Sequence, residues 1–370
     1  MRATRAVIHL DNFRRNIEAA GKKAGPHPKI CAPVKADAYG HGAVPVSRCA
    51  LDAGAEYLAV AAVSEGAELR AAGITSPILL LSQALPPELP EIISLGLIPL
   101  VSDEEFVEQA AGEAKSAGKR LSLHLKVDTG MGRMGCRPEK AALLAKKIAS
   151  RRELSLEGVA THLSVSDSLD DGDFTYTKKQ LQKFREVITS IKNEGIDPGI
   201  VHAANSGALV FHEDSYFDMI RPGIFLYGYS PAASVEGGLS SEPVMEFKSN
   251  VVFIKKVKKG ESVSYGRTWT ARSDTYVGVV PAGYADGFTR LLSNDFSVWI
   301  NGKAYPLAGR ICMDQFMVNL GAKTEVRRWD DVVIFGPGLT TADDIAKQLR
   351  TISYEITCNI NKRVPRVYLG

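Results

Sequence analysis

A lysine at the end of an apolar run is the first residue whose type and place suggest chemistry. Lys35 stands in the segment CAPVKADAYGHG. An amine at the end of a buried strand loses solvation, which lowers the lysine pKa from about 10.4, and a neutral amine can form a Schiff base. Tyr39 can offer its phenol to an anion, while Gly40 and Gly42 permit close backbone approach. An ordinary surface lysine is the alternative.

Polar and charged side chains also follow later apolar runs. They are Lys126, Asp128, Arg133, His162, Asn205, Ser206 and Arg221, and Gly223 and Ile224 follow Arg221 closely. The order Arg221-Pro222-Gly223-Ile224 supplies a guanidinium and then backbone N–H groups, a combination typical of phosphate sites in barrels. Ser206 could add a hydroxyl, whereas Asn205 could anchor either a loop or a ligand.

A glycine-rich segment resembles a dinucleotide motif without its structural setting. Residues 130–135 read GMGRMG, which satisfies G-x-G-x-x-G after a predicted strand. A dinucleotide site needs a helix that opens inside the motif. Pro138 is a favoured first helical residue, and it predicts a helix that starts after the last glycine. We therefore expect no dinucleotide here.

The first 230 residues alternate short apolar runs with segments of helical period. The predicted strands are residues 29–35, 57–63, 77–82, 97–101, 121–127, 156–162, 200–205 and 219–226. Strand and helix units at this spacing predict a (β/α)₈ TIM barrel rather than a doubly wound sheet. The polar candidates fall at the C-terminal strand ends, where barrels carry their chemistry.

The sequence changes character after residue 229. The connector SPAASVEGGLSSEP precedes alternating or β-branched runs between glycine-containing turns, and only ADDIAKQLR there has a helical pattern. The expected fold class is α/β plus all-β. We predict a (β/α)₈ barrel domain over residues 1–235 and a mostly β domain over residues 236–370.

Composition excludes several classes of protein. Lys and Arg number 45 against 42 Asp and Glu, and the mixed charges indicate no nucleic-acid partner. No apolar run reaches the roughly 18 residues of a membrane span, and the first residues lack a secretory signal. The five cysteines are widely spaced without a C-x-x-C pair, which argues against disulfides and a metal site. We expect a cytoplasmic protein.

Longer motifs in this chain resemble the alanine racemase family. They are VKADAYGHG, KVDTGMGRMG, THLSVSD, HAANSGA, RPGIFLYG, VSYGRTW, AGYADG, GRICMDQ and TISYEITCNINKRVPR. These motifs run from Val34 to Arg366, so the resemblance covers nearly the whole chain. One departure is Asp37, where the family usually has Asn.

The resemblance implies a pyridoxal 5′-phosphate enzyme with a barrel and a β domain. Lys35 would hold the cofactor as a Schiff base and serve as one acid/base group. Tyr265, donated by the second subunit of a homodimer, would be the other. Arg221 would face the pyridine nitrogen, and His162 would bridge toward Tyr265.

The resemblance also implies the groups around phosphate and substrate. The phosphate would be held by Tyr39, Ser206, Gly223, Ile224 and Tyr354, with Asn205 beside them. Arg133 and the backbone of Met313 would meet the substrate carboxylate. Lys126 is similar to the family lysine that becomes carbamylated by CO₂. The carbamylated lysine would orient Arg133.

The implied reaction sets demands on two of these side chains. An arginine keeps its proton, because its pKa is above about 12. Arg221 would therefore leave the ring nitrogen unprotonated, which weakens the electron sink and limits side reactions. Tyr265 has an intrinsic pKa near 10 and needs a cationic neighbourhood to act as a base. His162 and Arg221 would supply it.

The leading hypothesis is interconversion of L-alanine and D-alanine, a peptidoglycan precursor. A decarboxylase of the same architecture is one alternative, which Arg221 and Met313 disfavour. A broader serine/alanine racemase is another, since a small pocket rejects one extra hydroxyl only weakly. A non-enzymatic cofactor carrier would not need the β domain.

Secondary expectations concern residues outside this set. His202 could brace Arg221, and Asp314 could position either its own loop or the contact to the substrate carboxylate. Tyr284 and Asp286 could line the substrate entrance. Cys312 is expected to be a small buried residue. The remaining histidines are expected at the surface or in packing: His9, His27, His41, His124 and His212.

Overall fold

The computed structural model describes residues 2–230 and 239–370, and contacts divide them into two units. The barrel unit holds residues 14–38, 43–230 and 239–241. The β unit holds residues 2–13, Tyr39–Gly42 and Glu242–Gly370. The predicted boundary between residues 235 and 236 lies outside the described residues, as does much of the connector.

In the described part of the barrel unit, eight parallel strands form one sheet, in the order β8-β7-β6-β5-β4-β3-β2-β9. The two end strands, β8 and β9, also contact each other. The prediction of a (β/α)₈ barrel is confirmed. The strands are β2 (Lys29–Pro33), β3 (Tyr57–Val60), β4 (Ile78–Leu80), β5 (Ile98–Val101), β6 (Leu121–Lys126), β7 (Leu154–Ala160), β8 (Ile200–His202) and β9 (Met219–Ile220). Most end earlier than predicted, because the following residues leave the sheet to form the loops.

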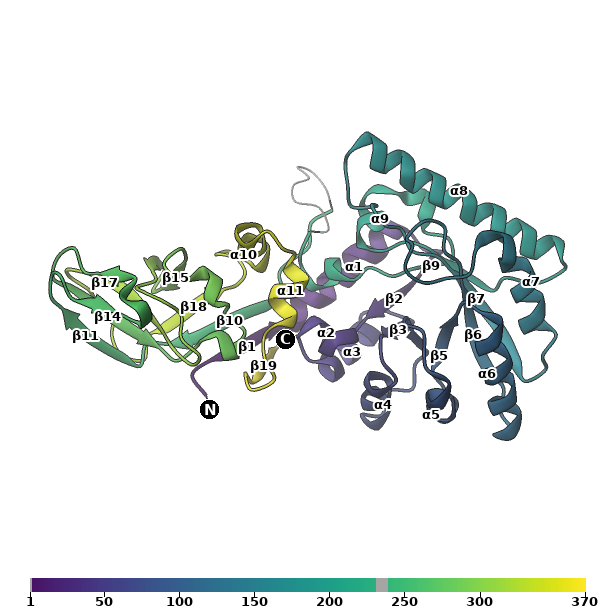
Figure 1. Cartoon of the computed structure of the whole chain (residues 1–370), viewed down its shortest axis with the longest axis horizontal. Coiled ribbons are helices and arrows are strands. Elements are labelled where there is room, and N and C mark those ends of the chain that lie inside the picture. The colour runs from purple at the N-terminus through teal and green to yellow at the C-terminus, as the bar shows by residue number, and fades with distance from the viewer. Residues whose placement is uncertain (1, 231–238) are drawn as a thin grey trace. The chain divides into compact units, whose positions relative to one another are not determined.

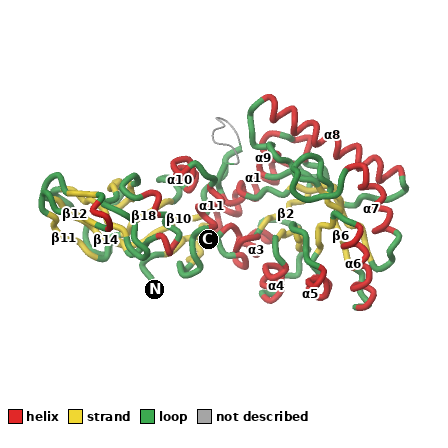
Figure 2. The backbone as a smooth tube through the Cα atoms, in the orientation of Figure 1, coloured by secondary structure: helices red, strands yellow, loops and turns green. Residues whose placement is uncertain are grey.

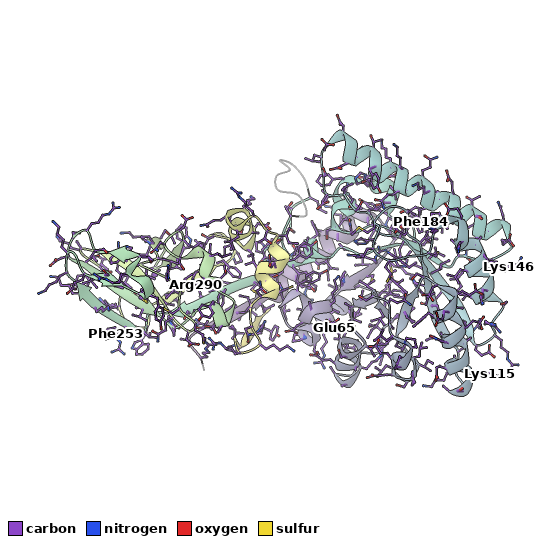
Figure 3. All side chains as sticks on the ribbon, in the orientation of Figure 1. Glu65, Lys115, Lys146, Phe184, Phe253 and Arg290 are labelled. Atoms are coloured by element: carbon purple, nitrogen blue, oxygen red, sulfur yellow. The ribbon has the colours of Figure 1, made fainter. Side chains whose placement is uncertain are left out.

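Helices flank these strands (Figure 1). They are α1 (Leu10–Ala24), α3 (Ala43–Asp52), α4 (Val63–Ala71), α5 (Leu89–Leu95), α6 (Glu104–Ser116), α7 (Pro138–Ala149), α8 (Asp171–Asn193) and α9 (Ser206–Phe211). Most of them have a buried and an exposed face, as their helical period predicts. Phe184 of α8 is buried, whereas Lys115 of α6 and Lys146 of α7 are exposed (Figure 3). Across residues 2–230 and 239–370, no helix combines the length and the apolar character that crossing a bilayer requires.

Strands and loops dominate the β unit (Figure 2). Its described residues form sheets in the orders β16-β15-β18-β10-β1-β19, β11-β14-β17 and β12-β13. The strands are β1 (Arg5–His9), β10 (Met245–Asn250), β11 (Phe253–Val257), β12 (Ser262–Val263), β13 (Trp269–Thr270), β14 (Thr275–Val280), β15 (Ser297–Ile300), β16 (Lys303–Pro306), β17 (Phe316–Gly321), β18 (Asp331–Phe335) and β19 (Arg366–Leu369). The predicted helix is confirmed as α10 (Ala342–Leu349), and α11 (Ser353–Cys358) is an addition.

Strand β1 belongs to the sheet of the β unit. It pairs antiparallel with β10, where Ala6 faces Phe247, and parallel with β19, where Ala6 faces Arg366. These residues were predicted to belong to the first domain. Pairing with strands so distant along the chain leaves no local pattern from which to predict it.

Candidate active site

Lys35 follows β2 and opens a left-handed turn. The segment α2 (Lys35–Tyr39) is not an ordinary helix, because residues 36–39 have φ between +52° and +53°. A left-handed helical conformation costs an L-residue roughly 1–2 kcal/mol. Such strain persists only where surrounding contacts enforce it, and it concentrates at functional sites. The unusual backbone therefore marks the loop of Lys35 as a place of function.

Two carboxylates hold this turn. Oε1 of Glu65 accepts a hydrogen bond from the Ala36 N–H at 2.7 Å, and its Oε2 accepts from the Ala61 N–H at 2.8 Å. Oδ1 of Asp37 accepts from the Ala43 N–H at 2.7 Å, at the start of α3. An asparagine carbonyl could accept the same bond, which explains why the departure at Asp37 is compatible with the fold.

Arg221 is a buried cation held on three sides. Its Nη1 donates to Nδ1 of His202 at 2.5 Å. Its Nη2 donates to the carbonyls of Thr161 at 2.9 Å and Ala203 at 3.2 Å. Burial lowers the pKa of Arg221 to about 10, so the group stays charged at neutral pH. The prediction that His202 braces Arg221 is confirmed.

Lys126 and His162 lie in the field of that cation. Burial, followed by the charges of Arg221 and Arg133, lowers the pKa of Lys126 well below its usual value and raises its neutral fraction. Burial, followed by the charges of Lys126 and Arg221, likewise lowers the pKa of His162. His162 is therefore neutral at neutral pH. This corrects the expectation that it shares in a cationic neighbourhood; Arg221 is the fixed cation.

The glycine-rich loop after β6 folds back on itself. Oδ1 of Asp128 accepts from the N–H groups of Gly130 at 2.9 Å and Gly132 at 3.1 Å. Helix α7 begins only at Pro138, so no helix N-terminus opens inside the motif, as predicted. The loop leaves the side chain of Arg133 exposed.

Hydrogen-bond donors gather after β8 and β9. The buried Ser206 hydroxyl accepts from the Phe225 N–H at 3.2 Å, so its hydrogen remains able to donate. A 3₁₀ turn over Ile224–Tyr227 follows β9, and its first hydrogen bond runs from the Leu226 N–H to the Gly223 carbonyl at 3.0 Å. The N–H groups of Gly223 and Ile224 precede that bond, as at any helix start. These three donors fit a phosphate.

Asn205 makes contacts of a supporting kind. Its Oδ1 accepts from the Ala208 N–H at 3.0 Å and the Ser166 hydroxyl at 2.7 Å. Its Nδ2 donates to the Leu163 carbonyl at 3.2 Å. These bonds favour the alternative in which Asn205 anchors a loop.

Gln180 of α8 was not singled out from the sequence. Its buried side chain donates to the His162 carbonyl at 3.2 Å and accepts from the Ser164 N–H at 3.1 Å. It thereby fixes the backbone that carries His162. A glutamine within a helical segment carries no local signal of this role.

The β unit brings Tyr39 and Tyr354 together, with ring centroids 5.5 Å apart. The close approach expected at the adjacent glycines is confirmed. A Cβ on Gly40 would lie 2.2 Å from the Thr357 carbonyl oxygen, and one on Gly42 would meet the Tyr368 hydroxyl. The segment Tyr39–Gly42 therefore packs tightly on α11 and β19.

Tyr265 stands on a strained 3₁₀ turn of the β unit. Its side chain is 70% exposed. Ser264 before it has φ +70° and Gly266 after it has φ +71°. The Ser264 hydroxyl donates to the Arg310 carbonyl at 2.7 Å, which ties this turn to residues 310–315. The strained backbone presents the phenol outward.

Two more exposed side chains lie on loops joined to this turn. Met313 is 52% and Tyr284 43% exposed. The Ala285 N–H donates to the Met313 carbonyl at 3.0 Å, and the Tyr284 N–H donates to the Cys312 carbonyl at 3.1 Å. Cys312 is half-buried rather than buried. We call Tyr265, Tyr284 and Met313 the exposed cluster.

An arginine clamp supports the exposed cluster. Arg363 contacts Asp286 through Nε and Asp314 through Nη2, both at 2.7 Å. Asp286 is fully buried, so it supports the loop instead of lining an entrance. The contact with Arg363 favours the alternative in which Asp314 positions its loop.

Family models account for the chain on both sides of the connector. Residues 8–231 match the alanine racemase N-terminal domain, and residues 244–368 match the C-terminal domain. The chain belongs to the alanine racemase family. This family depends on pyridoxal phosphate.

Individual proteins that are similar to this chain over its full length are also alanine racemases. The alanine racemase of Treponema denticola is 50% identical over 100% of this chain and 99% of that protein. That of Desulforamulus reducens is 41% identical over 99% of this chain and 98% of that protein. A solved alanine racemase from Clostridium difficile superposes with a TM-score of 0.95 at 37% identity, covering 100% of this chain and 96% of that one.

Proposed function

We propose that this racemase interconverts L-alanine and D-alanine with pyridoxal 5′-phosphate held in the barrel unit. The carrying observation is the pair formed by Lys35 after the first barrel strand and the braced cation Arg221 after the last. It occurs in a chain that the family models match on both sides of the connector.

The barrel residues fit the polar groups of this cofactor. The amine of Lys35 would bind its aldehyde carbon. The Ser206 hydroxyl and the N–H groups of Gly223 and Ile224 would bind its phosphate, because they are donors with capacity to spare. The proposal also assigns the phenols of Tyr39 and Tyr354 to the phosphate.

Inversion at Cα requires removal of a proton on one face and delivery of a proton on the other. When bound, pyridoxal phosphate supplies a conjugated ring that takes up the negative charge. Lys35 Nζ would exchange the proton on one face. The partner subunit's Tyr265 would exchange it through Oη on the other, and the neutral imidazole of His162 would hydrogen-bond to that phenol.

Arg221 sets the strength of charge withdrawal. It holds its proton, since even the lowered pKa of about 10 keeps it charged at neutral pH. Facing the ring nitrogen, it would donate a hydrogen bond without transferring a proton. Its bonds to Thr161 and Ala203 keep the guanidinium in one orientation.

The substrate carboxylate would be met by the Arg133 guanidinium and the Met313 N–H. Lys126 would act on Arg133 indirectly. Its lowered pKa provides the neutral amine that adds to CO₂, and the resulting carbamate carries a negative charge that would orient Arg133.

The exposed cluster supports a homodimer. Aromatic and sulfur-containing side chains that stay exposed on connected loops are typical of protein interfaces. In a homodimer, the partner subunit's Tyr265 and the partner subunit's Met313 would enter each site. We expect the enzyme to work in the cytoplasm, which cell fractionation would test.

The decisive experiment is chiral analysis of alanine incubated with the cofactor-loaded enzyme. We expect either enantiomer to reach an equal mixture, and Lys35→Ala to lose at least about a thousandfold in rate, as for loss of a principal catalytic group. Lys29→Ala is the matched control, because Lys29 begins the strand that Lys35 follows and pairs with surface Glu56. Normal activity in Lys35→Ala would refute the proposal, and CO₂ release without racemisation would support the decarboxylase. The same assay with serine measures breadth.

A further inference from the structure

A chain of polar side chains runs through the barrel from Arg221. Nδ1 of His202 accepts from Arg221, and Nε2 of His202 lies 2.8 Å from Nδ1 of His124. Nε2 of His124 faces Oε1 of Glu157 at 3.8 Å, and the Tyr57 hydroxyl donates to the same oxygen at 3.0 Å. Barrel interiors are usually packed with branched apolar residues. The presence of these polar side chains in the barrel interior therefore requires an explanation other than packing.

This row of polar side chains connects the carboxylate of Glu157 to the guanidinium of Arg221 through two neutral imidazole rings. Burial is the main cause that lowers the pKa of both His124 and His202. The nearby imidazole of His124, followed by donors that include Tyr57, lowers the pKa of Glu157 to about 2. Glu157 is therefore ionised and both imidazoles are neutral, with Arg221 protonated at the other end.

These charges permit one arrangement of protons. Arginine only donates, so Nδ1 of His202 must carry a lone pair and its Nε2 the hydrogen. That hydrogen points at Nδ1 of His124, which must accept it. The hydrogen of His124 then sits on Nε2, where it faces the Glu157 carboxylate.

The backbone is built around this arrangement. Strands β6 and β7 pair Leu123 with Leu156 and then His124 with Gly158, which leaves Glu157 as the extra residue of a β-bulge. Bulges re-aim side chains near active sites. A Cβ on Gly158 would lie 2.6 Å from Cε1 and Nδ1 of His124, so glycine makes room for the ring.

We propose that Glu157 is a positioning residue, which through His124 and His202 fixes the proton order that presents Arg221 to the ring nitrogen. The role of Arg221 toward the cofactor rests on the proposed function, whereas the proton order does not. In Glu157→Gln, the amide can donate to Nε2 of His124. That donation favours the reversed tautomers of both rings, whereas Arg221 favours the original ones, because an N–H on Nδ1 of His202 would oppose an N–H of Arg221. The substitution therefore sets the two ends of the network in competition and weakens the bond that holds Arg221.

Histidine tautomers test the proton order directly. The full chain, loaded with pyridoxal phosphate, would be labelled with ¹⁵N-histidine and examined by NMR, with signals assigned by their loss in His124→Asn and His202→Asn. We expect the Nε2–H tautomer for both rings. A hydrogen on Nδ1 of either ring in the unsubstituted enzyme would overturn the proposal.

Variants then test the positioning role. Glu157→Gln should shift the tautomers and lower kcat for racemisation about tenfold with little change in KM, a barrier increase of about 1.4 kcal/mol. Glu157→Asp should restore the tautomers and part of the rate. Glu153→Gln is the matched control, because Glu153 precedes the same strand and pairs with exposed Arg152. Unchanged tautomers in Glu157→Gln, or an equal loss in Glu153→Gln, would refute the role. Absence of racemisation in the unsubstituted enzyme would instead refute the proposed function.

Discussion

Burial sets the protonation of the histidines in the barrel. Desolvation is the first cause that lowers the pKa of His124, His162 and His202. In the unfolded chain a histidine titrates near 6.5. The unfolded state therefore binds protons at a higher pH than the folded state does. The stability that these residues contribute is complete above that pH and declines below it.

We predict acid sensitivity that begins at mildly acidic pH. Three unmatched protons correspond to a decline in the free energy of unfolding of up to about 4 kcal/mol per pH unit below roughly pH 6. Chemical denaturation of the full chain at a series of pH values measures this slope. His202→Asn should reduce this slope by the contribution of about one proton, because one of the three histidines is removed. A free energy of unfolding that stays constant down to about pH 5 would contradict the prediction.

Asp37 offers a test of a single acceptor. Asp37→Asn keeps an oxygen for the Ala43 N–H and a residue that tolerates left-handed backbone. We expect its free energy of unfolding to change by less than about 0.5 kcal/mol, whereas Asp37→Ala should lose about 1 kcal/mol. Thermal melts of the two variants decide this. Equal losses would mean that the bond to Ala43 contributes nothing.

At the scale of elements, the left-handed turn depends on helix α4. The Glu65 carboxylate accepts from the N–H groups of Ala36, Ala61 and Ala62. Glu65→Ala should lower the free energy of unfolding by about 1–2 kcal/mol, because three backbone donors lose a charged acceptor and one of those bonds is partly buried. It should also slow racemisation, since the turn orients Lys35.

Denaturant titration and the chiral assay measure both effects of Glu65→Ala. Glu68→Ala is the control, because Glu68 is an exposed residue of the same helix. If Glu65→Ala unfolds and racemises alanine like the control, the left-handed turn does not depend on the Glu65 carboxylate.

Local pattern predicted the elements whose signal is local. The barrel strands are short apolar runs bounded by helical segments, so period and spacing revealed each of them. The glycines before α3 were also readable, since backbone contact at Gly40 and Gly42 needs small residues. Strand β1 and the turn at residues 36–39 were not, because distant pairing and enforced strain leave no mark on neighbouring residues.

The residues of the candidate site likewise fall into those with a local sequence signal and those without one. Lys35 and Arg221 stand out because charged residues at strand ends are conspicuous, and His202 could be linked to Arg221 from its strand. His124 was expected at the surface or in packing. It is buried, and its hydrogen bond to His202 was not predicted. The role of Glu157 depends on a bulge, which appears only when β6 and β7 are paired.

At the scale of the whole molecule, the two proposed bases lie on different units. Lys35 belongs to the barrel unit and Tyr265 to the β unit. A barrel by itself would hold the cofactor but lack the second base. This distribution argues against the carrier hypothesis, and it makes the origin of Tyr265 in each site the central question.

Subunit complementation answers that question. Lys35→Ala and Tyr265→Ala should each be inactive alone. A mixed dimer would contain one site with Lys35 from one subunit and Tyr265 from the other, and one site that lacks both. Random reassortment should therefore restore about one quarter of the unsubstituted activity in an equimolar mixture. Lys35→Ala mixed with the double variant is the control and should stay inactive. If each Tyr265 served its own subunit, the test mixture would stay inactive as well, because every site would still lack one base.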